Sequence, residues 1–327
     1  KLLSVPGSDP KRVNDLLLLR PDAAALSDPE PKDSGDDRHV VFFHGDIQNF
    51  QEEMALQPDA AQWMGWSLEQ VAHMLGPRFP GQHIWVVRAS TMYLNKFSCY
   101  HNFVESNMFG APEHSFYSRD TGAFHHLSYY YLFRFLSTHQ NTKPTSNFES
   151  SFLGLLLSGC KRASVCVGRS LLSHAMERAD LPNRLPPHGG AAGLPAGFQL
   201  TLVGFSKGCV VLNQMVYELA GARADPLMSP FARSISDMFW LDGGHPGGSE
   251  TWVTDKQVLK ELASSGVSIH AHVTPYEVRD PMRAWVGREY GCFVEALQEF
   301  GACPSKKLHF EDEPASIENH FRVILEF

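Results

Sequence analysis

The chain contains 327 residues, of which 43% are hydrophobic, and it carries a formal net charge of −8 at pH 7. A chain of this length and apolar content can bury a substantial core. Its negative charge, with no long basic run, argues against nucleic acid or an anionic membrane surface as the main partner. Because no apolar stretch approaches the roughly 20 residues of a membrane-spanning helix, we expect a soluble globular protein with no transmembrane segment.

The first third of the chain predicts two parallel strands joined by a helix. The apolar runs at 39–43 and 84–87 are typical of strands that are buried on both faces. Between them, Ser67 can cap a helix with a regular apolar face. An earlier strand is expected at 14–20, followed by an exposed polar loop at 20–38 that is rich in Pro, Asp and Ser.

A further helix is predicted at 122–139, and an insertion rich in Ser, Gly and Pro follows at 139–197. The insertion contains an apolar stretch that is long enough for one or two helices. Two interpretations of it are open: a lid over a functional site, or a poorly ordered excursion at the surface.

The second half of the chain alternates strands with helices. Four apolar runs end in polar or glycine residues, as strands of a parallel sheet do. They lie within residues 197–208, 236–244, 267–281 and 306–321. The clearest helices are predicted at 209–221 and 281–301. This alternation predicts one α/β domain over residues 1–327, with a mostly parallel central sheet and helices on both faces.

Ser206 lies between two glycines at the end of the first of these runs. The segment Gly204-Phe205-Ser206-Lys207-Gly208 matches the G-x-S-x-G pattern, between a strand and a helix, which is the context of a nucleophile elbow. The glycines allow a sharp turn and a close approach of neighbouring backbone. We therefore predict Ser206 as a nucleophile and the amide of Lys207 as one donor to an oxyanion. The alternative is a serine that merely caps the helix.

The segment His44-Gly45-Asp46 follows an earlier strand and is the predicted source of the second oxyanion donor, through the amide of Asp46 or Ile47. We expect His44, Gly45 and Phe205 to line the substrate pocket. Four aromatic residues farther along are expected either to wall this pocket or to cover the sheet edge. They are Tyr93, Phe97, Tyr100 and Phe103.

The order nucleophile, acid, histidine places the base near the C-terminal end of the chain. His320 follows the last strand and is preferred to His309, which lies inside an apolar run. Asp242 and Asp280 end consecutive strands, and either can orient the imidazole. Asp280 is preferred because it follows the penultimate strand, although its place before a proline is also that of an ordinary helix cap.

The six cysteines are scattered and show no metal-ligand spacing, and the predicted chemistry needs no metal or organic cofactor.

Several segments together resemble the chromosome 2 open reading frame 69 family. They read NKFSCYHNFVESNMFGAPEH, GFSKGCVVLNQ, WLDGGHPGGSETWVT, HVTPYEVRDPMRAW and ASIENHFRV. The resemblance implies an α/β-hydrolase-like fold and a mitochondrial protein, in the matrix, that is connected with respiratory-chain function. It also implies a targeting peptide ahead of Lys1. The family's nucleophile elbow carries over onto Ser206 and its terminal histidine onto His320.

The sequence is compatible with two functions. The first is a serine hydrolase of the esterase, lipase or thioesterase class, which cleaves an acyl ester or thioester through Ser206. Its partner would be a small acyl or lipid-like substrate. The second is a catalytically silent hydrolase fold that binds or regulates a mitochondrial protein partner.

Overall fold

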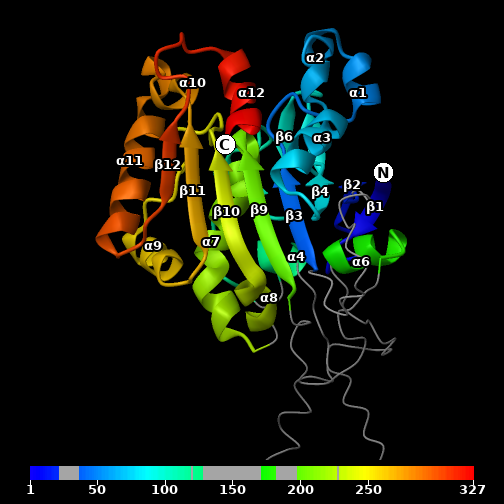
Figure 1. Ribbon diagram of the computed structural model, residues 1–327, viewed down its shortest axis with the longest axis horizontal. Coiled ribbons are helices and arrows are strands. Elements are labelled where there is room, and N and C mark those ends of the chain that lie inside the picture. The colour runs from blue at the N-terminus through cyan, green and yellow to red at the C-terminus, as the bar shows by residue number, and fades with distance from the viewer. Residues whose placement is uncertain (22–36, 119–120, 128–170, 182–196, 227) are drawn as a thin grey trace, which may run out of the picture.

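The computed structural model describes residues 1–21, 37–118, 121–127, 171–181, 197–226 and 228–327. Eight strands in these ranges form one sheet in the order β1-β2-β4-β3-β9-β10-β11-β12 (Figure 1). They are β1 (Leu2–Pro6), β2 (Val13–Leu19), β3 (Arg38–Phe43), β4 (His83–Val87), β9 (Gln199–Phe205), β10 (Ile235–Leu241), β11 (Ser268–Val273) and β12 (Ser305–Leu308). The pairs from β4 through β12 are parallel, whereas β2 pairs antiparallel with both β1 and β4. The mostly parallel sheet predicted from the sequence is confirmed.

The central strands are apolar along their whole length because both faces of the sheet are covered. In β3, Val40 and Phe42 belong to one buried cluster, while Val41 and Phe43 belong to a second cluster on the opposite face. The side chains of a central strand therefore pack against helices on both faces of the sheet.

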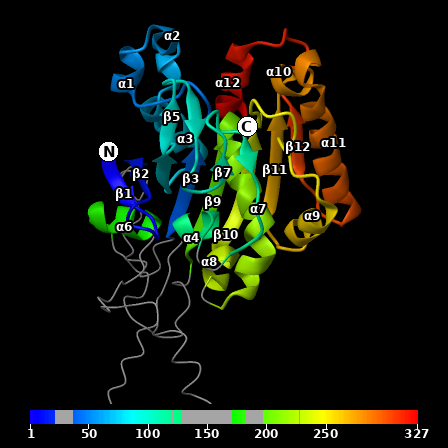
Figure 2. The same ribbon diagram turned by 180° about the vertical axis from the view of Figure 1, so that it is seen from behind.

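Two helices pack on one face of the sheet, in front of it in Figure 1: α3 (Leu68–Arg78) and α12 (Ile317–Glu326). The apolar cluster of the other face, seen in Figure 2, includes residues from six helices. They are α4 (Ala123–Leu127), α6 (Leu171–Arg178), α7 (Cys209–Ala224), α8 (Ser229–Ser234), α9 (Lys256–Ala263) and α11 (Ala284–Glu299). The expected helices on both faces are thus present, and the fold is α/β-hydrolase-like.

Short elements follow the strands and shape the functional end of the molecule. They are the helices α1 (Gln51–Ala55), α2 (Pro58–Ala61) and α10 (Pro275–Val278), the 3₁₀ turns η2 (Met64–Trp66), η3 (Ser206–Gly208) and η4 (Pro281–Arg283), and the hairpins β5 (Thr91–Tyr93) with β6 (Phe97–Cys99) and β7 (Glu105–Ser106) with β8 (Pro112–Glu113). In a parallel sheet, groups beyond the carboxyl ends of the strands converge on one edge, so these connections form the walls of any site there.

Part of the predicted insertion belongs to the core. In α6, Leu171 and Ala175 are fully buried, and the Arg178 guanidinium donates to the carbonyl of Leu3 in β1 (2.6 Å). The rest of the insertion, most of the expected loop at 20–38 and the expected helix beyond Leu127 lie outside the described residues. No helix among those described is long and apolar enough to cross a membrane.

Candidate active site

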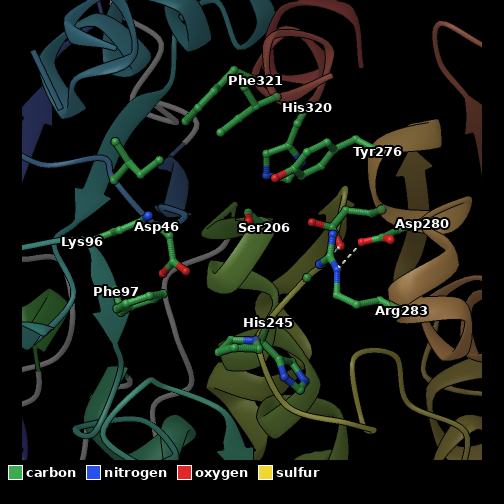
Figure 3. Close-up of a pocket in the computed structure, with 15 residues that line it drawn as sticks. Asp46, Lys96, Phe97, Ser206, His245, Tyr276, Asp280, Arg283, His320 and Phe321 are labelled. Carbon is green, nitrogen blue, oxygen red and sulfur yellow. Dashed lines mark hydrogen bonds and ion pairs between the residues drawn. The ribbon is translucent and has the colours of Figure 1, made fainter. Parts of the chain in front are cut away.

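The strand β9 ends in a strained turn at Ser206, whose φ of +51° is uncommon for a residue other than glycine. Close backbone contacts force this geometry. A Cβ on Gly204 would lie 2.9 Å from the Cα of Cys209, and one on Gly208 would lie 2.0 Å from the carbonyl oxygen of Phe43. Both flanking glycines are needed by the packing, and the turn places Ser206 on the wall of a pocket at the carboxyl edge of the sheet (Figure 3).

His320 faces the same pocket from the first half of α12, a helix whose N-cap Ser316 accepts from the amide of Asn319 (3.2 Å). The Nδ1 of His320 donates to Oδ2 of Asp242 at 2.7 Å. The side chain of Asp242 has no exposure. Because the proton lies on Nδ1, the Nε2 atom of the imidazole can accept a proton from a hydroxyl group.

Asp242 is held rigidly where β10 ends. Its φ is +47°, a conformation that Asp tolerates better than most residues. The amide of Thr274 donates to Oδ1 (2.7 Å), and the hydroxyl of Thr274 donates to Oδ2 (2.5 Å). Together with His320, these donors fix the orientation of the carboxylate.

Asp280, the acid preferred from the sequence, contacts other groups. Its carboxylate accepts from Nε of Arg283 and from the amide of Met282, each at 2.8 Å, at the start of η4. The Arg283 guanidinium lowers the pKa of this carboxyl. Asp280 lines the pocket as a helix cap, and the preference for it is corrected, since Asp242 is the carboxylate bonded to His320.

Of the expected oxyanion donors, the structure excludes Ile47. Its φ is +70° and its amide donates to the carbonyl of Lys96 (2.8 Å). Lys207 lies in the first turn of a helical segment, where amides lack an acceptor within the helix. Asp46 lines the pocket, and the loop before it runs against the elbow, because a Cβ on Gly45 would lie 2.7 Å from the Cβ of Ser206. The amides of Lys207 and Asp46 are therefore the candidate pair.

The residues expected to line the pocket lie behind its wall instead. His44 is fully buried; its Nδ1 donates to the carbonyl of Gly45 (2.7 Å), and its Nε2 accepts from the amide of Ala89 (2.9 Å). The ring of Phe205 packs against the imidazole of His320, with ring centroids 4.7 Å apart. His44 thus supports the loop that contains Gly45, and Phe205 supports the imidazole of His320.

Of the four aromatic residues expected as walls, Phe97 lines the pocket. Tyr100 and Phe103 are buried in the core, where the Tyr100 hydroxyl donates to the carbonyl of His44 (2.8 Å), and Tyr93 packs in the β5–β6 hairpin against Phe109.

The pocket, of about 430 Å³, has more charged groups than the sequence analysis anticipated. Its lining includes five charged side chains: Asp46, Lys96, Glu277, Asp280 and Arg283. Glu277 is buried beside Arg283, with Oε2 and Nη1 2.7 Å apart, and burial raises the pKa of its carboxyl to about 7. The polar residues that follow β11 in the sequence, Glu277 and Arg283 among them, are the signal for this charged lining.

His309, the base rejected from the sequence, is buried and forms a hydrogen bond with His272 (2.8 Å). Within the described ranges, no cluster of three His, Cys, Asp or Glu side chains could hold a metal ion.

A model of the C2orf69 protein family matches residues 1–303 of this sequence. The chain belongs to the C2orf69 family. It is 59% identical to the Mitochondrial protein C2orf69 homolog of Danio rerio over 334 residues, covering 100% of this chain and 85% of the relative. It is 44% identical to Mitochondrial protein C2orf69 of Homo sapiens over 339 residues, covering 99% and 85% of the two chains.

Two solved structures are similar to this C2orf69 family member at much lower identity. One described as YahD with malic acid covers 96% of this chain and 99% of its own, with 10% identity and a TM-score of 0.36. A thermostable esterase covers 97% of this chain and 56% of its own, with 11% identity and a TM-score of 0.37.

The second glycine of the elbow gives a stability prediction for this C2orf69 family member. Gly208→Ala should lower the free energy of unfolding by roughly 3 kcal/mol, because the added methyl group overlaps the Phe43 carbonyl and the backbone must move. Gly291→Ala in α11 is the matched control: it meets open space and should raise stability by about 0.5–1 kcal/mol. Urea unfolding of both variants checks this, and equal stabilities would contradict the packing of the elbow against β3.

Proposed function

We propose that the chain is a mitochondrial serine hydrolase that cleaves an acyl ester or thioester. One observation carries the proposal. The imidazole of His320 is bonded to the buried carboxylate of Asp242, in the pocket that also contains Ser206 on its strained turn. Nucleophile, base and orienting acid are recognised by this geometry and these roles rather than by their places in a sequence.

The reaction follows from the groups in the pocket. Nε2 of His320 takes the Ser206 proton as Oγ attacks the acyl carbonyl carbon, and Asp242 stabilises the imidazolium that forms. The amides of Asp46 and Lys207 donate to the negative oxygen of the tetrahedral intermediate. His320 returns the proton to the departing alcohol or thiol. In the second half of the reaction, His320 takes a proton from a water molecule, which attacks the carbonyl carbon of the acyl-serine. The bond to Oγ breaks, His320 returns the proton to Ser206, and the carboxylic acid is released.

The lining of the pocket favours a compact polar acyl compound over a long-chain lipid. Charged side chains reach it from two sides, Lys96 and Asp46 on one and Asp280 and Arg283 on the other (Figure 3). Glu277 also lines the pocket and is paired with Arg283. Burying an alkyl chain against such groups would remove their charges from water, which costs free energy even where the charges are paired. Polar groups on the substrate would satisfy them.

The proposed location rests on the relatives. The Danio rerio and Homo sapiens proteins are both named mitochondrial, which supports the same compartment for this chain. The matrix is our proposal within that compartment. The family resemblance also connects it with respiratory-chain function.

A serine-directed fluorophosphonate tests the chemistry. We expect one adduct by intact mass on the wild-type chain and none on Ser206→Ala, because only an activated serine attacks the phosphorus and displaces fluoride. A control serine hydrolase labelled in parallel shows that the probe is competent. If the folded wild-type chain stays unlabelled beside that control, the hydrolase proposal fails and a binding role is favoured.

A further inference from the structure

The side chain of Lys207, directly after the candidate nucleophile, is fully buried. Lysine is almost never fully buried unless its charge is paired. Its Nζ donates to the carbonyl of Phe109 (2.7 Å) and lies 3.2 Å from Oδ1 of Asp46. The ammonium also lies 5.7 Å from the centroid of the Phe97 ring. The side chain thus leaves the elbow and reaches the loop after β3.

Asp46, at the other end of this ion pair, is held by several donors. Its Oδ1 accepts from the amide of Ser98 (2.8 Å) and from the hydroxyl of Ser98 (3.0 Å), in addition to Lys207. The next residue, Ile47, is fixed by its bond to the carbonyl of Lys96. The backbone at Asp46 is therefore anchored from the β5–β6 hairpin, which contains Lys96 and Ser98, and from the elbow.

The two ends of the ion pair are the two residues whose amides form the proposed oxyanion hole. We propose that Lys207 is a positioning residue of that hole: its side chain fixes Asp46, and so sets the separation of the two amide donors. This inference rests on the proposed hydrolase function. Donors must lie about 2.7–3.1 Å from the oxyanion to stabilise it, so a small displacement of one amide lowers the rate.

Charge gives Lys207 a second effect at the same place. Asp46 lines the pocket, and its carboxylate without a counter-charge would repel the negative charge that develops on the substrate oxygen. The ammonium of Lys207 neutralises it from within the protein. Removing the lysine alone therefore leaves a harmful anion, whereas removing both charges does not.

Three variants separate these effects: Lys207→Met, Asp46→Asn and the double variant. Lys207→Met should lower kcat for p-nitrophenyl acetate by about 10²-fold, with KM little changed, because only transition-state contacts are lost. It should slow fluorophosphonate labelling of Ser206 by a similar factor, because the phosphoryl oxygen occupies the same hole. The double variant should have a kcat at least about tenfold higher than that of Lys207→Met.

Lys256→Met is the matched control, because it breaks an exposed ion pair, with Glu299 at 2.7 Å, and should leave both rates unchanged. Rates are normalised to folded protein by circular dichroism. If Lys207→Met fails to fold, Asp46→Asn and the double variant are measured instead, because neither of them leaves an unpaired carboxylate at position 46. Equal rates in these two variants and in the wild type would overturn the positioning role.

Labelling of the wild type separates this inference from the proposed function. A labelled wild type with Lys207→Met at the same rate overturns the positioning role alone. A folded wild type that is not labelled overturns the hydrolase function, and the positioning role with it. A labelled wild type, a slow Lys207→Met and a faster double variant support the proposal.

Discussion

Asp242→Asn should lower kcat for p-nitrophenyl acetate by about 10³–10⁴-fold, whereas Asp280→Asn should change it by less than about threefold. The contrast follows from which carboxylate contacts the base. Asp242 accepts from Nδ1 of His320 at 2.7 Å, while Asp280 is bonded to Arg283 and to the amide of Met282. Both changes remove a negative charge from the same end of the sheet, so charge alone cannot produce the difference.

Asp242→Asn should lose activity because the substitution changes the tautomer of His320. Asn tolerates the φ of +47° at this position and can still accept from the amide of Thr274, so the backbone is retained. Its amide group would instead donate toward Nδ1 of His320. The imidazole must then carry its proton on Nε2, where it can no longer take the proton of Ser206.

Urea unfolding at pH 7 controls for stability, since both variants should unfold within about 2 kcal/mol of the wild type. A folded Asp280→Asn variant that is as inactive as a mutant of the base, beside an active Asp242→Asn variant, would contradict the assignment of the acid. Equal and small effects of both changes would mean that His320 needs no orienting carboxylate.

The position of Asp242 illustrates what a single sequence can and cannot predict. Apolar runs and glycine spacing identify the strands, the elbow at Ser206 and the set of strand ends where functional groups gather. They make both Asp242 and Asp280 candidates, because both follow predicted strands of the same sheet, and chain order alone favours Asp280. The choice depends on a left-handed backbone at Asp242 and on the course of α12, and neither has a periodic signal.

The same limit applies to side-chain direction. The amide of Lys207 follows from the elbow pattern, but the burial of its ammonium against Asp46 depends on loops around Ser98 and Phe109 that are distant in sequence. The sequence favours Asp46 and Ile47 equally as donors, whereas the bond from the Ile47 amide to the carbonyl of Lys96 leaves Asp46 as the candidate. Tertiary contacts between loops, rather than local propensity, decide these cases.

The free energy of unfolding should fall steeply as the pH is lowered from 7 to 4, with the protein unfolding below about pH 5. Burial lowers the pKa values of six histidines from 6.5 to about 3 or 4; five of them are buried and His114 is half-buried. They are His44, His114, His126, His245, His272 and His309. A pKa that is lower in the folded state gives stability above the unfolded pKa of 6.5, and that stability is lost as the pH falls toward the folded value.

The magnitude comes from the difference between the two states. For His44, with a folded pKa of about 4, the stability lost at pH 5 is about 2 kcal/mol. Glu218 and Glu277 act in the opposite direction, because their folded pKa values of about 7 favour the protonated form, and each gains about 2 kcal/mol between pH 7 and 5. Six histidines outweigh two carboxyls in a fold whose total stability is typically 5–15 kcal/mol.

The prediction can be tested at His44 alone, a residue whose protonation affects both the stability of the protein and the loop of the active site. Its Nε2 accepts from the amide of Ala89, so protonation breaks that bond and disturbs the loop that contains Asp46. His44→Gln should reduce the loss of unfolding free energy between pH 7 and 5 by about 2 kcal/mol, because Gln does not titrate. His101→Gln, at an exposed histidine, should leave the slope unchanged. Urea unfolding at both pH values measures the slopes. Equal slopes in wild type and His44→Gln would mean that the imidazole takes up its proton without cost, against the bonded geometry of the loop.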